Sequence, residues 1–160
     1  MCHVSYGTFS SKSLGTVKPY CGDVYQALAA DSLIRNKITL LKGPAGVGKS
    51  YIAMGYLFHM LEKHKIDKIV IFCNTVATKG SAKLGYYPGD KNMKLLDSQI
   101  GNFLASKLGD ITAVERLIAS GELVLLPMSD IRGYDTTGMN AGIYITEAQN
   151  LDINLMKLAL

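Results

Sequence analysis

A phosphate-binding loop pattern is the feature that most restricts how this chain can fold. Residues 41–50 read LKGPAGVGKS, in which Gly43 and, after four intervening residues, Gly48-Lys49-Ser50 complete the GxxxxGK[ST] pattern. Glycines let the backbone wrap around a phosphate with its N–H groups pointing inward, and the following helix presents its positive end. Lys49 then reaches the terminal phosphates and the Ser50 hydroxyl holds Mg²⁺. The predicted nucleotide site comprises Gly43, Pro44, Ala45, Gly46, Val47, Gly48, Lys49 and Ser50.

The segments on either side give this loop the context that it requires. The apolar run ITLLK at 38–42 predicts a buried strand, and residues 49–64 carry apolar side chains at helical spacing. KIVIFC at 68–73 is a second buried-strand pattern. Strand, glycine loop, helix and strand is the alternation of an α/β protein. We therefore expect a P-loop NTPase with a parallel sheet flanked by helices.

The rest of the chain continues this alternation less regularly. Asp23 is a candidate N-cap for a helix that runs to about Ile34, after an extended lead-in over residues 1–20. Residues 74–93 are rich in Gly, Lys and Tyr, and a connection of this length favours a functional role. The further elements that we predict are helices over 94–108, 111–119 (capped by Asp110 and ended by Gly121) and from about Asp152, with strands over 122–127 and 142–146.

Size and composition indicate one globular domain, which we assign to residues 21–160. The chain has 160 residues, 48% apolar and 19% charged, with a net charge of +4, all ordinary for a domain with its own core. Its cysteines form no CxxC pair, and Cys73 ends an apolar run typical of a buried thiol in a reducing compartment. The chain shows neither a membrane-span pattern nor a signal-peptide pattern. We expect a cytoplasmic protein without a membrane partner.

The strand GIYIT at 142–146 and the residues after it decide what the phosphate loop can do. In motor and helicase proteins such a strand ends in two acids, the first for Mg²⁺ and the second for the attacking water. Thr146 and Glu147 occupy these two places here. Glu147 can orient water, whereas Thr146 offers only a hydroxyl to a metal-bound water. The predicted metal site is therefore Ser50, Glu147 and, through water, Thr146.

Four stretches of the chain resemble the PhoH-like family of P-loop ATPases. They are GPAGVGKS at 43–50, LGYYPGD at 84–90, IRG at 131–133 and TEAQN at 146–150. The likeness runs from about Gln26 to the last residue. The family occurs in bacteria and their viruses, binds ATP and is related to nucleic-acid helicases. The resemblance implies a helicase-like hydrolase that uses ATP and Mg²⁺ and has RNA or single-stranded DNA as a partner.

The resemblance also implies roles for individual residues. Glu147 would be the catalytic acid, acting beside Lys49 of the loop, and Gln149 would sense the terminal phosphate. Gln26, upstream of the loop, resembles the glutamine that reads adenine in helicase-like proteins, although a glutamine on a helix face is more often simply solvated.

Two departures from the family's pattern bear on activity and assembly. Thr146 stands where the family has Asp, and the family continues with a strand that lies between the acid strand and the loop strand. Strands 38–42 and 142–146 must then either pair directly or leave backbone groups open. We therefore expect an incomplete form of a longer protein, which self-associates or is completed by another polypeptide.

Basic and aromatic residues in the loops form a candidate nucleic-acid surface. A basic loop with tyrosines can stack bases and hold phosphates, and a solvated loop whose tyrosines pack on the core fits the pattern equally well. Arg132 can contact a phosphate or brace its loop on Asp130 or Asp135. The candidate residues are Lys79, Lys83, Tyr86, Lys91 and Arg132.

These observations leave two main functions open. The first is a Mg²⁺-dependent ATPase that acts on RNA or single-stranded nucleic acid. The second is a nucleotide-binding module with weak or no hydrolysis, which Thr146 and the short C-terminal part favour. A small-molecule kinase ranks last, because a lid that clamps two phosphates would have to draw on Arg35, Arg116 and Arg132 alone.

Overall fold

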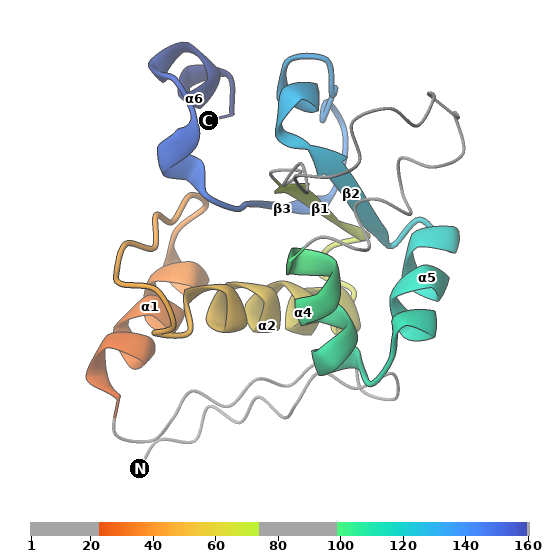
Figure 1. The fold of residues 1–160 in the computed structure, drawn as a ribbon, viewed down its shortest axis with the longest axis horizontal. Coiled ribbons are helices and arrows are strands. Elements are labelled where there is room, and N and C mark those ends of the chain that lie inside the picture. Colours follow the sequence, from red (N-terminus) through yellow and green to blue (C-terminus); the bar gives the residue numbers. More distant parts are fainter. Residues whose placement is uncertain (1–22, 74–98, 160) are drawn as a thin grey trace, which may run out of the picture.

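A three-stranded parallel sheet forms the centre of the computed structural model, which describes residues 23–73 and 99–159 (Figure 1). The strands are β1 (Lys68–Cys73), β2 (Leu123–Pro127) and β3 (Ala141–Ile145), in the order β2-β1-β3. Val70 of β1 lies opposite Val124 on one side and Ile143 on the other. The α/β class with a parallel sheet, predicted from the sequence, is confirmed.

The helices follow the predicted positions closely. Asp23 caps the first one by accepting hydrogen bonds from the backbone N–H groups of Tyr25 and Gln26, and Asp110 likewise accepts from Ala113. The predicted lead-in over 1–20, the connection over 74–93 and the first residues of the 94–108 helix lie outside the described residues. The elements are α1 (Val24–Arg35), α2 (Lys49–Glu62), α4 (Gln99–Leu108), α5 (Ile111–Ala119), α6 (Ile153–Ala159) and the 3₁₀ turns η1 (Met128–Arg132) and η2 (Ala148–Asn150).

Strand β1 is buried on both faces, as a central parallel strand should be. Ile69 and Ile71 belong to a large apolar cluster with side chains of α2, α4 and α5, while Val70 and Phe72 belong to a smaller one with Ile131. This alternation is the period of two that a strand imposes. Cys73 is 2% exposed, which confirms the predicted buried thiol.

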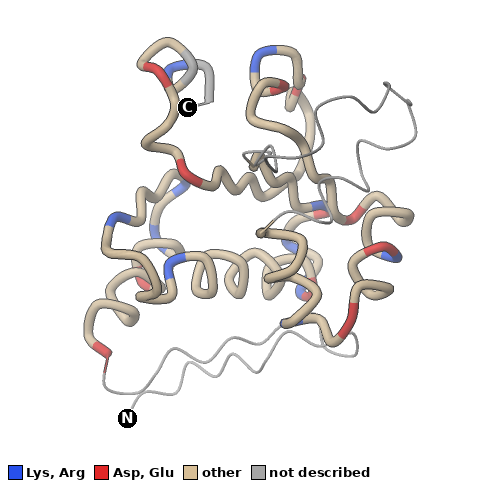
Figure 2. The backbone as a smooth tube through the Cα atoms, viewed as in Figure 1, with Lys and Arg blue, Asp and Glu red and all other residues tan. Residues whose placement is uncertain are grey.

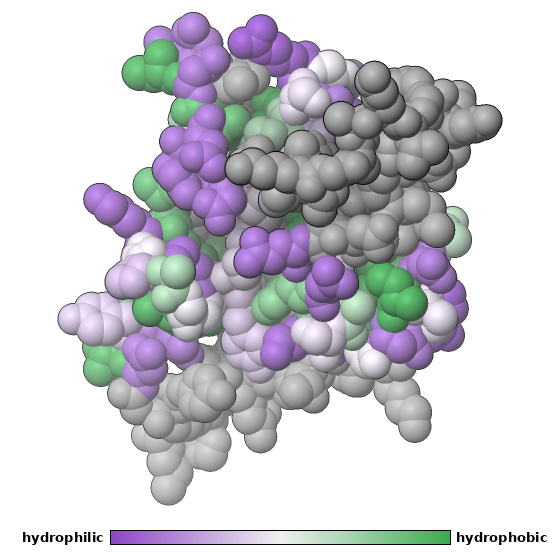
Figure 3. Space-filling view, viewed as in Figure 1, coloured by the Kyte–Doolittle hydropathy of each residue, from purple (hydrophilic) through white to green (hydrophobic). Residues whose placement is uncertain are grey.

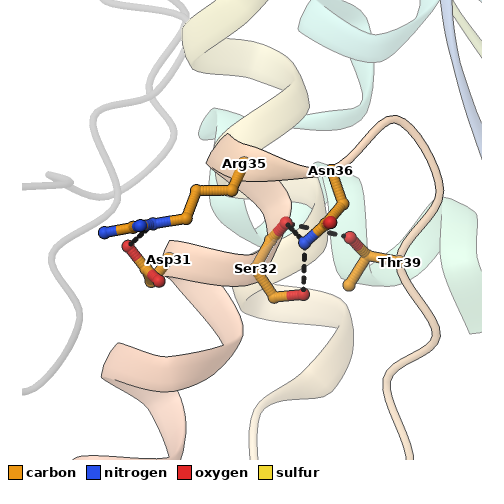
Figure 4. Close-up of polar contacts among 5 residues, drawn as sticks. All are labelled: Asp31, Ser32, Arg35, Asn36 and Thr39. Carbon is orange, nitrogen blue, oxygen red and sulfur yellow. Dashed lines mark hydrogen bonds and ion pairs between the residues drawn. The ribbon is translucent and has the colours of Figure 1, made fainter.

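The predicted strand over 38–42 is wrong. No strand forms there, and the side chains of Ile38 and Leu40 are 62% and 78% exposed. The start of this run is tied to the end of α1 instead, because the Asn36 side-chain amide and the Thr39 hydroxyl both donate to the Ser32 carbonyl (Figure 4). A strand needs a neighbour for its N–H and C=O groups. An apolar run indicates burial but does not supply that neighbour, and among the described residues β3 pairs only with β1.

The surface is most apolar around α1 and the segment that leads to the phosphate loop. Figure 3 shows hydrophobic residues there among polar ones. Charged residues of both signs are interspersed along the described backbone and form no single-sign stripe (Figure 2). None of the described helices combines the length and hydrophobicity that a membrane span requires. The large exposed apolar side chains of this region are Val24, Tyr25, Leu28, Ile34, Ile38, Leu40 and Val47.

Gly142 of β3 lets α2 pack closely on the sheet. A Cβ atom at this position would lie 2.4 Å from Leu57 Cδ2 and 3.0 Å from Ile66 Cδ1. We expect Gly142→Val to lower the free energy of unfolding by about 1–3 kcal/mol, the usual cost of overpacking. Chemical denaturation measures this. Gly133→Val is the control, because a Cβ atom there meets nothing within 4 Å. Equal stability of the two variants would contradict the close approach.

Candidate functional site

The loop between Gly43 and Ser50 has the backbone of an anion-binding turn. Gly46 and Gly48 adopt φ of +79° and +89°, in the left-handed region that glycine alone enters without strain. Gly48 is the N-cap of α2, which begins at Lys49. The first N–H groups of a helix have no partner within it, and they carry the positive end of the helix dipole. Residues 43–47 are exposed to solvent, so the loop is open to a phosphate.

Lys49 folds over the loop that precedes it. Its ammonium Nζ donates hydrogen bonds to the carbonyl oxygens of Gly43, at 2.8 Å, and Pro44, at 2.6 Å. An ammonium has three donors. Two of them brace the loop in this structure, and the third is available to an incoming phosphate oxygen. The charge of Lys49 is therefore held where the loop pattern predicts that the terminal phosphates bind.

Gln26 lies against the end of the same loop. The Asp23 carboxylate accepts the backbone N–H of Gln26, and the Gln26 side-chain Nε2 donates to the Val47 carbonyl at 3.3 Å. Gly48 leaves room for this contact, because a Cβ atom there would lie 3.2 Å from Gln26 Nε2. The structure thus places Gln26 at the nucleotide loop. Its adenine-reading role stays a prediction.

The phosphate loop and strand β3 meet through one hydrogen bond. Ser50 Oγ and Tyr144 Oη lie 2.9 Å apart, although the two residues are 94 positions apart in the chain. Gly142 and Tyr144 share the face of β3 that packs towards α2, and the ring of Tyr144 packs against the larger apolar cluster. Sequence reasoning missed Tyr144. The available signal was a hydroxyl two residues before Thr146, on the same face of the strand.

The Tyr144 hydroxyl is neutral at physiological pH. Burial raises its pKa above the ordinary value, and the negative charge of Glu147 raises it further, while the hydrogen bond from Ser50 acts in the opposite direction. A neutral phenol both donates and accepts hydrogen bonds.

Glu147 directly follows Thr146, where β3 ends. The Thr146 N–H still donates to Phe72 of β1 at 3.0 Å, and Glu147 then turns into the left-handed region at φ +52°. A non-glycine residue with positive φ is uncommon, and such conformations gather at functional sites. The exposed Glu147 carboxylate accepts a hydrogen bond from the Gln149 side-chain amide. These two predicted site residues are therefore in direct contact.

The side chains at this junction suit Mg²⁺ better than a transition metal. Ser50 and Glu147 offer hard oxygen atoms, and Mg²⁺ commonly binds through one or two such protein groups, keeping waters and substrate phosphates as its other ligands. In the two described ranges, no group of three His, Cys, Asp or Glu side chains gathers to hold a metal. The donor set therefore fits a cation that is bound together with phosphates.

The candidate nucleic-acid residues are only partly visible in the structure. Lys79, Lys83, Tyr86 and Lys91 lie outside the described residues. Arg132 is 62% exposed at its side chain, with one guanidinium nitrogen 4.0 Å from Asp152 Oδ2. The acid beside Arg132 is therefore Asp152 rather than Asp130 or Asp135, and a contact of Arg132 with a phosphate stays a prediction. The reason is topological, since α6 packs beside η1 and brings Asp152 to Arg132.

Comparison with known proteins shows which protein family this chain matches. The sequence profile of the PhoH family, described as PhoH-like protein, matches residues 20–160. A PhoH-like protein of Bacillus subtilis is 33% identical over 129 residues, which are 79% of this chain and 39% of that protein. Protein PhoH2 of Thermobispora bispora is 32% identical over 133 residues, 79% of this chain and 29% of its own length. A PhoH-like protein of Mycobacterium leprae is 28% identical over 147 residues, which are 91% of this chain and 40% of that protein. The chain thus spans roughly a third of these relatives.

Proposed function

The chain belongs to the PhoH-like protein family, and on that premise we propose that it is a Mg²⁺-dependent ATPase that acts on RNA or single-stranded nucleic acid. The observation that carries the proposal is the hydrogen bond between Ser50 and Tyr144. It joins the phosphate loop to the strand after which Glu147 stands. A loop that only bound phosphate would need no carboxylate beside it, whereas hydrolysis needs a group that orients water.

In the proposed reaction, each residue of the site has its own role. The N–H groups of the loop and the Lys49 ammonium bind the β- and γ-phosphates of ATP and stabilise the charge that develops on them. Glu147 orients the attacking water and accepts its proton. Mg²⁺, when bound at Ser50, neutralises phosphate charge. Gln149, which donates to the Glu147 carboxylate, holds that carboxylate in place, and its role as a sensor of the terminal phosphate is part of this proposal.

One observation favours the second function, nucleotide binding with weak hydrolysis. Thr146, which follows directly after β3, carries no charge. A metal site with one carboxylate instead of two attracts Mg²⁺ less strongly. Tight binding of Mg-ATP by the wild-type chain without turnover, in both the presence and absence of polymer, would assign it to this second class.

The experiment that tests the proposed function is steady-state ATP hydrolysis with and without single-stranded RNA or DNA. We expect the polymer to stimulate hydrolysis and its affinity to fall with salt, because bound phosphates release counterions. Replacing Lys79, Lys83 and Lys91 together by Ala should reduce the log–log salt slope by about 2, since each single-strand phosphate contact contributes roughly 0.7.

A matched triple variant controls for the loss of net charge. Lys63, Lys65 and Lys68 lie at the C-terminal end of α2 and the start of β1, away from the phosphate loop. Their replacement by Ala should leave the salt slope unchanged. If both triple variants have the wild-type slope, the loop over 74–93 does not contact the polymer.

A further inference from the structure

Tyr144 carries a hydroxyl to the point of the site where the sequence predicted only Ser50, Thr146 and Glu147. Its Oη is 2.9 Å from Ser50 Oγ, and it is the side-chain partner of that hydroxyl among the described residues. The contact is built into the fold rather than incidental. Gly142, two residues earlier on the same face, leaves room for Leu57 of α2 against the strand, so α2 lies close to the face of β3 that carries Tyr144.

The chemistry of a serine ligand explains what this hydroxyl can do. When Ser50 Oγ gives a lone pair to a cation, its proton has to point to an acceptor elsewhere. The acceptor fixes the direction of the lone pair and raises the basicity of the ligand, as partners behind metal ligands generally do. A carboxylate is the strongest acceptor for this purpose. At position 146 this chain has Thr, whose side chain supplies none.

We propose that Tyr144 is the positioning residue of the metal site, accepting a hydrogen bond from the Ser50 hydroxyl so that the serine oxygen faces Mg²⁺. The proposal rests on the proposed function, since it concerns the same nucleotide site. In this proposal, the neutral phenol of Tyr144 accepts the hydrogen bond of Ser50 that a carboxylate at position 146 would otherwise accept. Tyr144 lies two residues before Thr146, on the same face of β3. Tyr144 acts through Ser50 and does not itself touch the nucleotide.

The hydrogen bond between Ser50 and Tyr144 could instead serve only to stabilise the packing of α2 on β3. A purely structural bond would affect stability and leave the Mg²⁺ requirement of ATP binding unchanged. The two roles therefore differ in one measurable quantity, the Mg²⁺ concentration that gives half of the maximal tightening of ATP binding. Titration calorimetry of ATP in EDTA and at increasing MgCl₂ measures it without relying on turnover.

Tyr144→Phe keeps the packed ring and removes only the hydroxyl. We expect it to raise the half-maximal Mg²⁺ concentration roughly tenfold, the lower end of the effect of losing a partner behind a metal ligand. ATP affinity in EDTA should stay within about twofold, because no metal is then positioned. Tyr134→Phe is the matched control, since the Tyr134 ring packs edge-on against Phe72 on the other face of the sheet. Its half-maximal Mg²⁺ concentration should equal that of the wild type.

Ser50→Ala and the double variant test whether the two hydroxyls act together. Ser50→Ala should shift the titration in the same direction, and the double variant should shift it no further, because the two groups act as one unit. Additive shifts, or a Tyr144→Phe titration that overlays the wild type, would overturn the role of Tyr144. If ATP binding by the wild type does not respond to Mg²⁺ at all, the proposed function itself fails, and this role falls with it.

Discussion

Glu147→Gln should abolish ATP turnover and leave Mg-ATP binding intact. The carboxylate is the one group at the end of β3 that can take a proton from water, and removing a general base typically costs about 100- to 10,000-fold in rate. Gln has the same shape, so it fits the backbone at φ +52° as Glu147 does. Its amide oxygen still accepts the hydrogen bond from Gln149. Single-turnover hydrolysis and ATP calorimetry on the same preparation separate the two effects.

Glu115→Gln is the control for the lost negative charge. Glu115 is an exposed residue of α5, a helix that packs on α4 and β2 rather than on the phosphate loop. We expect this variant to hydrolyse ATP at the wild-type rate. Full turnover by Glu147→Gln would remove its catalytic role and leave the left-handed turn at this residue as a structural feature alone.

Local signals in the sequence were enough to predict most of the elements. The Asp23 and Asp110 caps start α1 and α5 at the predicted residues, and β1 has the predicted bounds 68–73. Each of these depends on side chains within a few positions of one another. A cap needs one carboxylate and two or three nearby N–H groups, and a buried strand needs a short apolar run.

Contacts between distant segments could not be predicted in the same way. The apolar run at 38–42 is identical in kind to β1, and the two differ only in whether a neighbouring strand is present. The loop residues were predictable from a local pattern, whereas the contact of Gln26 with Val47 became visible only in the structure. The contact of Ser50 with Tyr144 depends on how closely α2 packs on β3. The glycine at position 142 leaves room for this close packing, and no pattern in the sequence predicts it.

Lys49→Ala should weaken ATP binding more than any other single change in the loop. The ammonium braces the carbonyls of Gly43 and Pro44 and retains one donor for the phosphates. Hydrogen bonds to charged groups are worth about 1.5–3 kcal/mol each, which corresponds to a loss of affinity of roughly 10- to 100-fold. Adenosine carries no phosphate, so its affinity should not change. Titration calorimetry with ATP, ADP and adenosine provides the three comparisons.

The neighbouring Lys42 separates the specific effect from general electrostatics. It is an exposed lysine one residue before the loop, so Lys42→Ala removes the same charge from almost the same place. Long-range attraction of a triphosphate at physiological salt is screened over about 8 Å, so Lys42→Ala should change the ATP affinity only slightly. A loss of affinity confined to Lys49→Ala, and larger for ATP than for ADP, is the result expected of an ammonium that faces the terminal phosphate. Equal ATP dissociation constants for wild type and Lys49→Ala would instead mean that the loop binds no phosphate. The only role of Lys49 would then be to hold the carbonyls of Gly43 and Pro44.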